Sequence, residues 1–230
     1  MIVPFLIGFF FLVVFVRWRM RWEVQAALER DPAASSAWEV LFLYPSTWAL
    51  ACHRLSHFFY RSKLRFPARL ISQAARGITG IEIHPGAQIG RGLFIDHGFG
   101  VVIGETAVIG ENVTLFQGVT LGGTGKERGK RHPNVGNNVV VGAGAKVLGN
   151  ITIGDNVQIG ANAVVIRDVP SHSVVVGVPG RIVRQEGRHF PGINLDHTTL
   201  PDPLTQALEK LQHEIDAIEH QLKEHRQKSS

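Results

Sequence analysis

The chain has 230 residues, of which 44% are hydrophobic and 19% charged, and this composition excludes a wholly disordered protein. The single cysteine, Cys52, excludes an internal disulfide framework and a multi-cysteine metal site, and is typical of a reducing compartment. The net charge is +5, but the basic residues form separate groups near 17–21, 126–131 and 181–188, so no continuous surface for DNA or RNA is predicted.

Residues 1–16 are almost wholly apolar and carry no charged side chain, and Arg17, Arg19 and Arg21 follow at once. A membrane-spanning helix needs about 20 apolar residues, so this run lies at or just below the limit. Two interpretations stay open for residues 1–19. They form an anchor whose arginines hold the rest of the chain in the cytoplasm, or they result from a mis-called start, because Met20 begins a soluble-looking helix. Both predict a cytoplasmic protein, tethered to the inner face of the membrane in the first case.

Residues 20–80 are predicted to be α-helical. Apolar periodicity indicates helices at 21–30, 45–61 and 65–78, and the dipeptide Asp31-Pro32 ends the first of them. No pattern of catalytic residues stands out in this region.

Residues 81–183 repeat with a period of six. One aliphatic residue recurs in each repeat, at Ile83, Ile89, Ile95, Ile103, Ile109, Leu115, Leu121, Val135, Val141, Val147, Ile153, Ile159 and Val165. Glycine follows directly at eight of these thirteen positions, far above its overall share of 25 in 230. A period of six fits neither an amphipathic helix nor a sheet meander. It predicts a parallel β-helix of about four turns, in which three six-residue sides make one triangular turn.

The repeat is interrupted twice. The step from Ile95 to Ile103 is eight residues and the step from Leu121 to Val135 is fourteen, so the second interruption ejects a loop around 122–133. Insertions in solenoid proteins usually gather on the binding face.

A linker at 184–201 leads to a predicted amphipathic helix within 202–230. Apolar residues spaced alternately by four and three stand at Leu204, Leu208, Leu211, Ile215, Ile218 and Leu222. Such spacing favours a coiled coil over a helix packed on its own domain.

Polar residues that interrupt the repeat are the candidates for chemistry. His97 has a side chain that takes up protons near neutrality, and a carboxylate on its second nitrogen would fix its tautomer. Glu82 lies fifteen residues earlier, near one turn of the coil, and is therefore a candidate partner. From the residues alone, a structural role for His97 is favoured over a catalytic one.

The loop at 121–133 combines glycines with four basic residues and ends in His132. Its charges suit a phosphate or carboxylate ligand, but the loop by itself favours a flexible, solvated segment. Zinc held by His84, His97 and His132 is a further alternative, but β-helical zinc sites use a short-spaced histidine pair that this segment lacks, so no metal is predicted.

Several motifs resemble the serine O-acetyltransferase family, a group of hexapeptide-repeat acetyltransferases, in its short bacterial form. They are Glu82-Ile-His-Pro85, Ile95-Asp-His-Gly98, Val102-Ile-Gly-Glu-Thr106, Gln117-Gly-Val-Thr-Leu-Gly-Gly-Thr-Gly-Lys126, Arg131-His-Pro133 and Gly177-Val-Pro-Gly-Arg-Ile-Val183. The resemblance implies a left-handed β-helix. It also implies acetyl transfer from acetyl-CoA to the hydroxyl of L-serine, which gives O-acetyl-L-serine in the first step of cysteine biosynthesis.

The resemblance also implies a role for each matching residue. His97 would be the general base, with Glu82 at the position of its partner carboxylate, which is often aspartate. Asp31 and Asp96 would bind the serine amino group, and Arg131 and His132 its carboxylate. The residues that would line the groove for CoA are Gly123, Ala143 and Ala161, whereas Gln158 stands where some relatives carry a lysine.

An acetyltransferase for another hydroxyl acceptor, such as a sugar or an antibiotic, is the alternative function, and a tethered scaffold without activity is the third. The charged set at Asp31, Arg131 and His132 suits the two charges of an amino acid, and His97 argues against the scaffold. The family implies a homotrimer or a dimer of trimers, with the C-terminal helices bundled on the threefold axis. The sulfhydrylase complex that relatives form through a C-terminal isoleucine is not expected, because this chain ends in Ser230.

Overall fold

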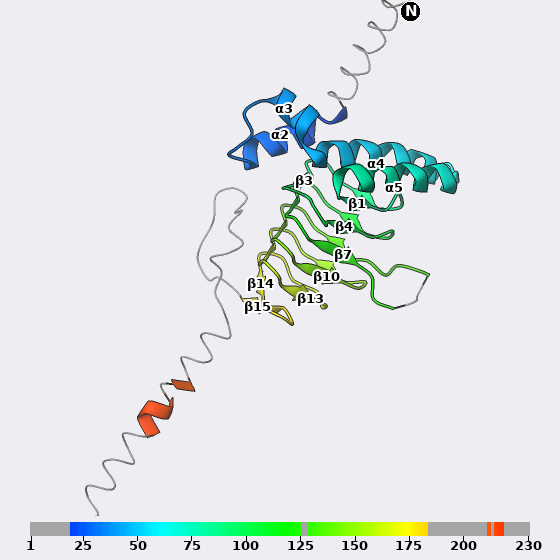
Figure 1. Cartoon of the computed structure of the whole chain (residues 1–230). Helices are drawn as coiled ribbons and strands as arrows, with labels where there is room; N and C mark the ends of the chain where they lie inside the picture. Colours follow the sequence, from blue (N-terminus) through cyan, green and yellow to red (C-terminus); the bar gives the residue numbers. More distant parts are fainter. Residues whose placement is uncertain (1–18, 126–127, 184–210, 213, 219–230) are drawn as a thin grey trace, which may run out of the picture.

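The computed structural model describes residues 19–125, 128–183, 211–212 and 214–218. A helical cap stands at one end of a tapering coil of short parallel strands (Figure 1). The cap consists of α2 (Arg21–Arg30), α3 (Ala37–Leu43), α4 (Pro45–Arg61) and α5 (Arg65–Thr79). The two long helices α4 and α5 lie side by side across the first turns of the coil (Figure 1).

Three of these helices match the predicted ranges to within a residue, whereas the short helix α3 was not predicted. Seven residues are too few to show a clear apolar period. The local start signal is Ser36, whose side chain accepts a hydrogen bond from the Glu39 backbone N–H. At the far end of the cap, α5 stops at Gly80, which takes the left-handed conformation with φ of +71°.

The coil has three faces, each built from strands one turn apart. Face A contains β1 (Glu82–Ile83), β4 (Val102–Ile103), β7 (Thr120–Gly122), β10 (Lys146–Leu148) and β13 (Val164–Val165). Face B contains β2 (Gln88–Ile89), β5 (Val108–Ile109), β8 (Asn134–Val135) and β11 (Thr152–Ile153). Face C contains β3 (Phe94–Ile95), β6 (Thr114–Leu115), β9 (Val140–Val141), β12 (Gln158–Ile159), β14 (Val174–Val176) and β15 (Arg181–Val183).

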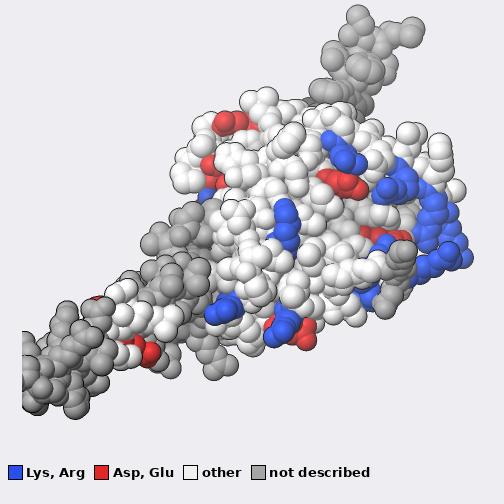
Figure 2. Space-filling view, turned by 60° about the horizontal axis from the view of Figure 1, so that its bottom comes forward, with Lys and Arg blue, Asp and Glu red and all other residues white. Residues whose placement is uncertain are grey.

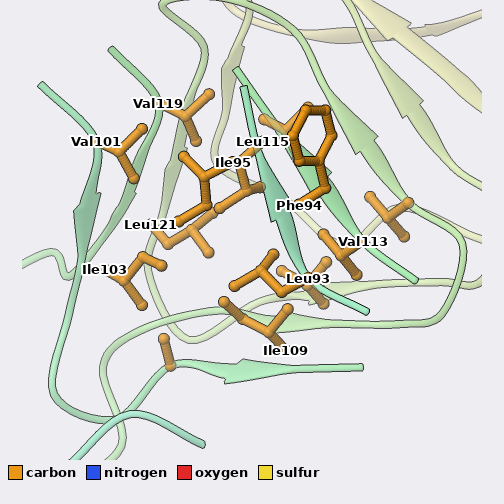
Figure 3. Packing of buried hydrophobic residues seen from close by; sticks show 14 of the residues in the cluster. Leu93, Phe94, Ile95, Val101, Ile103, Ile109, Val113, Leu115, Val119 and Leu121 are labelled. Atoms are coloured by element: carbon orange, nitrogen blue, oxygen red, sulfur yellow. The ribbon is translucent and has the colours of Figure 1, made fainter. Parts of the chain in front are cut away.

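The period-six residues form the core of the coil, as predicted. Twelve of the thirteen are buried, and Ile89 is half-buried against them. Figure 3 shows the first turns, where Ile95, Ile103 and Ile109 from the three faces point toward one another. The final strand β15 pairs antiparallel with β14, so the parallel coil ends before residue 183.

The strand register shows where the repeat is irregular. Lys146 pairs with Val164, and the interval between them is that of three regular six-residue sides. The pairing of Glu82 with Val102 and that of Thr120 with Lys146 both span longer intervals, because each turn contains one of the two interruptions. The extra residues are therefore excluded from the strands and collect at corners, without disturbing the stacking of the faces.

The predicted C-terminal helix lies mostly outside the described residues. Residues 211–212 and 214–218 are helical, and Leu211, Ile215 and Ile218 are each about half exposed. The described residues include no helix long and apolar enough to span a membrane. Residues 1–18, where the apolar segment lies, are outside that range.

Candidate active site

Both interruptions of the repeat lie at the edges of face A. The first is the corner of residues 96–101, between β3 and β4, which we call the His97 corner. The second combines residues 104–106, after β4, with the loop 123–133 between β7 and β8, and we call it the Arg131 corner. The predicted site residues divide between these two corners.

The His97 corner presents its imidazole to the outside. His97 has the left-handed φ of +56°, and its side chain is 75% exposed. Its Nε2 lies 3.8 Å from Oδ1 of Asp96, which is too long for a hydrogen bond. The backbone of this turn packs closely against Ile81, since a Cβ on Gly98 would meet the Ile81 side chain at 2.5 Å. The imidazole is therefore presented on a close-packed turn with an open approach.

The helical cap brings a second carboxylate to this corner. Asp31, at the end of α2, accepts hydrogen bonds from the Tyr44 hydroxyl at 2.5 Å and from the Ala33 N–H at 2.8 Å. The pKa of Tyr44 is raised by burial, by its bond to Asp31 and also by the charge of Asp96. The structure thus brings Asp31 and Asp96 to the same tyrosine, Tyr44, to which the sequence assigned no role.

Arg30 fixes the position of Asp31. This buried guanidinium donates to the carbonyls of Gly92 and Val113 at 3.2 and 3.3 Å and to the hydroxyl of Thr114 at 3.2 Å. The end of α2 is therefore pinned to the first two turns of the coil. Burial lowers the pKa of Arg30, but an arginine keeps its charge at neutral pH.

Glu82 lies at the same edge of face A as His97, one turn earlier. Its Oε2 forms an ion pair with Nη1 of Arg76 at 3.2 Å. It also lines an open groove of about 460 Å³ between the end of α5 and the Phe99–Val102 segment. Among the described residues no hydrogen bond or ion pair joins Glu82 to His97, so the structure places the two at one corner without pairing them.

The Arg131 corner is closely hydrogen-bonded. Nη2 of Arg131 pairs with Oε2 of Glu105 at 2.6 Å, and the Tyr60 hydroxyl donates to Oε1 of the same carboxylate at 2.8 Å. These two bonds lower the pKa of Glu105, which stays ionised at neutral pH. His132 is buried against Thr106, and burial lowers the pKa of its imidazole.

The three residues predicted to bind CoA also divide between the two edges. Ala143 and Ala161 stack on the edge that carries the His97 corner, and the Asn162 N–H donates to the Ala143 carbonyl at 2.8 Å. Gly123 lies in the Arg131 corner, where a Cβ would meet the carbonyl oxygen of Arg131 at 3.1 Å.

Face A separates the two halves of the site within one chain. The His97 corner precedes β4 and the Arg131 corner follows it, so the two lie at opposite edges of this face.

Sequence reasoning assigned no role to Arg30, Tyr44, Tyr60, Glu105 or Thr106. The signal for Glu105 and Thr106 was available, because polar residues follow Ile103-Gly104 next to the ejected loop in the repeat. The two tyrosines had no such signal, because only the packing of the cap on the coil brings them to the corners.

The surface charge is uneven. On the face shown in Figure 2, Lys and Arg gather at one side and are scattered elsewhere among uncharged residues. The described residues hold no group of three His, Cys, Asp or Glu side chains that could bind a metal ion.

The coil with six-residue sides defines the class of protein. Residues 132–167 match the bacterial transferase hexapeptide family (six repeats), which is the class that such a coil indicates. It is 58% identical over 198 residues to the serine acetyltransferase of Staphylococcus xylosus, covering 86% of this chain and 91% of the relative. It is also 56% identical over 200 residues to that of Synechococcus elongatus, with coverages of 87% and 81%. The chain belongs to the serine acetyltransferase family.

Solved structures agree with this assignment. The structure of Neisseria gonorrhoeae serine acetyltransferase matches with a TM-score of 0.71 and 42% identity, over 74% of this chain and 68% of that one. The Brucella abortus strain S19 enzyme in complex with coenzyme A matches with a TM-score of 0.71 and 42% identity, over 74% and 69%. The predicted left-handed β-helix and the predicted acetyl transfer to serine are confirmed.

Proposed function

We propose that the chain transfers the acetyl group of acetyl-CoA to L-serine in a site shared by two subunits of a trimer. The His97 corner of one subunit would face the Arg131 corner of its neighbour. The observation that carries this proposal is the division of the site: two aspartates and a histidine lie on one edge of face A, and the arginine with the second histidine lies on the other.

The charges of the two corners suit the acceptor. Asp31 and Asp96 supply negative charge for an ammonium group, and Arg131 and His132 supply donors for a carboxylate. The serine hydroxyl would then lie beside His97. A sugar has neither charge and would leave both sets of groups unpaired.

The reaction is a direct transfer in this arrangement. His97 takes the proton from the serine hydroxyl as its oxygen attacks the acetyl carbonyl carbon. The carbon–sulfur bond then breaks, and the imidazolium returns the proton to the departing thiolate, so that O-acetyl-L-serine and CoA form. The exposed imidazole next to the Asp96 charge suits this role. Glu82 is proposed to act on His97 through a rearrangement that releases it from Arg76.

A complementation experiment tests the shared site. The single variants His97→Ala and Arg131→Ala are each expected to be nearly inactive. Co-expressed, they form mixed trimers in which some sites take His97 from one chain and Arg131 from another. Random mixing predicts that about a quarter of sites are restored. If the mixture stays as inactive as the separate variants, the shared site is wrong.

Ala143, Ala161 and Gly123 are proposed to leave room for CoA. The outward position of Ala161 between β12 and β13 supports this, because a larger side chain there would fill the groove without disturbing the core. Ala161→Phe is expected to raise KM for acetyl-CoA while KM for L-serine stays unchanged. Equal increases in both constants would contradict the assignment.

The trimer is proposed to be bundled by its C-terminal helices, and a dimer of trimers through the helical cap would extend it. The half-exposed Leu211, Ile215 and Ile218 support the bundle, because their spacing is that of a coiled-coil seam. Leu211→Asp with Ile218→Asp is expected to melt these helices while the coil stays trimeric. Light scattering that shows a monomer or a dimer of the unaltered chain would contradict the assembly.

Residues 1–19 are proposed to tether the enzyme to a membrane. Uncharged residues fill positions 1–16 and three arginines follow. A chain starting at Met20 is expected to leave the membrane fraction with its activity intact. Continued sedimentation with membranes would contradict the tether.

A further inference from the structure

The tripeptide Gly104-Glu105-Thr106 contacts both residues proposed to bind the substrate carboxylate. It stands at the corner after β4, and the Arg131-His132 dipeptide returns from the loop to lie directly on it. The proposed function gives this tripeptide no role, although it is part of a motif that the sequence singles out.

Thr106 determines which nitrogen of His132 carries the proton. The Thr106 hydroxyl oxygen accepts the backbone N–H of Arg131 at 3.0 Å and that of His132 at 3.2 Å. A hydroxyl has two acceptor sites and one donor, so its proton is left to donate to Nδ1 of His132, 2.9 Å away. The Thr106 backbone N–H also points to this Nδ1 at 3.2 Å.

A nitrogen that faces two donors must itself be unprotonated. The neutral imidazole of His132 therefore carries its proton on Nε2, and this N–H is the one available to an anion. The lowered pKa of His132 agrees with a neutral ring.

Glu105 orients Arg131 in the same way. The guanidinium donates to Glu105 at 2.6 Å through Nη2, and through Nη1 to the carbonyls of Arg128 and Gly129 at 3.4 and 3.3 Å. A guanidinium has five donors in a rigid plane, so these three bonds leave two for an incoming carboxylate. Tyr60, from α4, donates to the other oxygen of Glu105, and the Arg65 guanidinium lies 3.7 Å above its ring. The carboxylate is thus held from both sides.

Gly104 makes the approach possible. A Cβ at this position would lie 1.9 Å from Cδ2 and 2.1 Å from Nε2 of His132. Only a residue without a side chain leaves room for the imidazole against the end of β4.

We propose that Gly104-Glu105-Thr106 is the positioning element that makes the site selective for acceptors with a carboxylate. Thr106 sets His132 as an Nε2–H donor, Glu105 aims Arg131, and Gly104 leaves room for the ring. The inference rests on the proposed function, because it assigns the carboxylate to Arg131 and His132.

The test compares L-serine with 2-amino-1,3-propanediol, which keeps the ammonium and the hydroxyl but lacks the carboxylate. The variants are Thr106→Val, Thr106→Ser and Glu105→Gln, with Glu111→Gln as the matched control at an exposed corner one side further along the coil. KM or, for slow turnover, the inhibition constant is measured for each compound, and kcat for L-serine.

Thr106→Val and Glu105→Gln are each expected to raise KM for L-serine at least about tenfold with a smaller change in kcat. Their constants for the diol are expected to change by less than about twofold. Thr106→Ser keeps the hydroxyl and is expected to restore the KM of the unaltered enzyme, and Glu111→Gln to change nothing. In ¹⁵N-histidine spectra, Thr106→Val is expected to convert His132 from the single Nε2–H tautomer to a mixture.

Equal losses for both acceptors would overturn the proposal, because they indicate general damage to the site. An unchanged KM for L-serine in folded Thr106→Val and Glu105→Gln would overturn it as well, and so would an Nδ1–H tautomer of His132 in the unaltered enzyme. Failure of the proposed function would look different: the unaltered enzyme would not acetylate L-serine, or Arg131→Ala would leave KM for L-serine unchanged.

Discussion

The two corners of face A are built in opposite ways. At the His97 corner the imidazole is 75% exposed, and the carboxylate of Asp96 lies 3.8 Å away. At the Arg131 corner the residue His132 is only 8% exposed, its Nδ1 lies 2.9 Å from the Thr106 hydroxyl, and Nη2 of Arg131 donates to Glu105 at 2.6 Å. A group that must exchange a proton with a substrate needs an open approach, whereas donors that bind an anion act best when they are oriented beforehand. Under the proposed function, this difference fits a preformed carboxylate site at the Arg131 corner and an accessible imidazole at the His97 corner.

The largest expected effect is the loss of turnover when the exposed imidazole of the His97 corner is removed. His97→Ala is expected to lower kcat for L-serine at least about a hundredfold, because the general base is lost. Glu82→Gln is expected to cost less, since the imidazole remains. The matched control is His172→Ala, because His172 is also exposed in the left-handed conformation, with φ of +59°. Near-normal turnover in folded His97→Ala would contradict the assignment.

The next largest expected effect is weaker binding of L-serine when a side chain is added at the Arg131 corner. Gly104→Ala is expected to displace the His132 ring, because the new Cβ would lie 1.9 Å from Cδ2. KM for L-serine should rise at least about tenfold, since the oriented donor is lost. Gly129→Ala is the control, because a Cβ at Gly129 meets no atom within 4 Å and the substitution keeps the backbone carbonyl that accepts from Arg131. If Gly104→Ala had the same KM for L-serine as Gly129→Ala and the unaltered enzyme, the role of the oriented His132 ring in binding would be wrong.

Removing the Arg30 contacts that hold α2 beside the His97 corner should lower the stability of the fold as well as the affinity for L-serine. Arg30→Met removes a buried guanidinium and leaves the carbonyls of Gly92 and Val113 without this donor, which is expected to cost about 2–4 kcal/mol in the free energy of unfolding. KM for L-serine should also rise, because Asp31 is no longer pinned. Denaturant unfolding measures the first effect and steady-state kinetics the second. Arg167→Met, at an exposed arginine, serves as the control.

The smallest expected effect is a pH dependence of the free energy of unfolding, caused by two histidines, His53 and His84. Burial lowers the pKa of His84 to about 4 and that of His53 to about 3. Both return to about 6.5 in the unfolded chain. Between about pH 6.5 and 4 the unfolded state therefore binds more protons, and stability is expected to fall as the pH falls.

Substituting His84 should flatten this profile. In His84→Asn the side-chain oxygen can replace Nδ1 as the acceptor of the Gly86 N–H, which lies 2.9 Å away in the unaltered chain. Urea midpoints at pH 7, 6 and 5 are expected to decline less than in the unaltered enzyme, with His172→Asn as the control. If the urea midpoint declined as much in His84→Asn as in the unaltered enzyme, His84 would not contribute to the pH dependence of stability.

The sequence alone determined the coil, its core and the positions of its two interruptions. A six-residue period repeats the same local requirement at each side, an inward aliphatic residue and a small residue at the bend, so local pattern and global fold coincide. For the same reason the two corners could be found as breaks in the pattern, and His97, Arg131 and His132 lie in those breaks. The ranges of the three longer helices also followed from apolar periodicity, whereas the seven residues of α3 were too few to show one.

Only the tertiary structure decided how the site residues are grouped. Tyr44 and Tyr60 lie in the cap, far along the chain from the side chains that they contact, and no local pattern encodes contacts of such separation. The roles of Glu105 and Thr106 depend on a loop that leaves the coil after β7 and returns to the end of β4, so their partners are distant in sequence and adjacent in space. Face A, finally, keeps the His97 corner and the Arg131 corner apart because an extended strand has a fixed rise per residue, a separation that appears only when the chain is coiled.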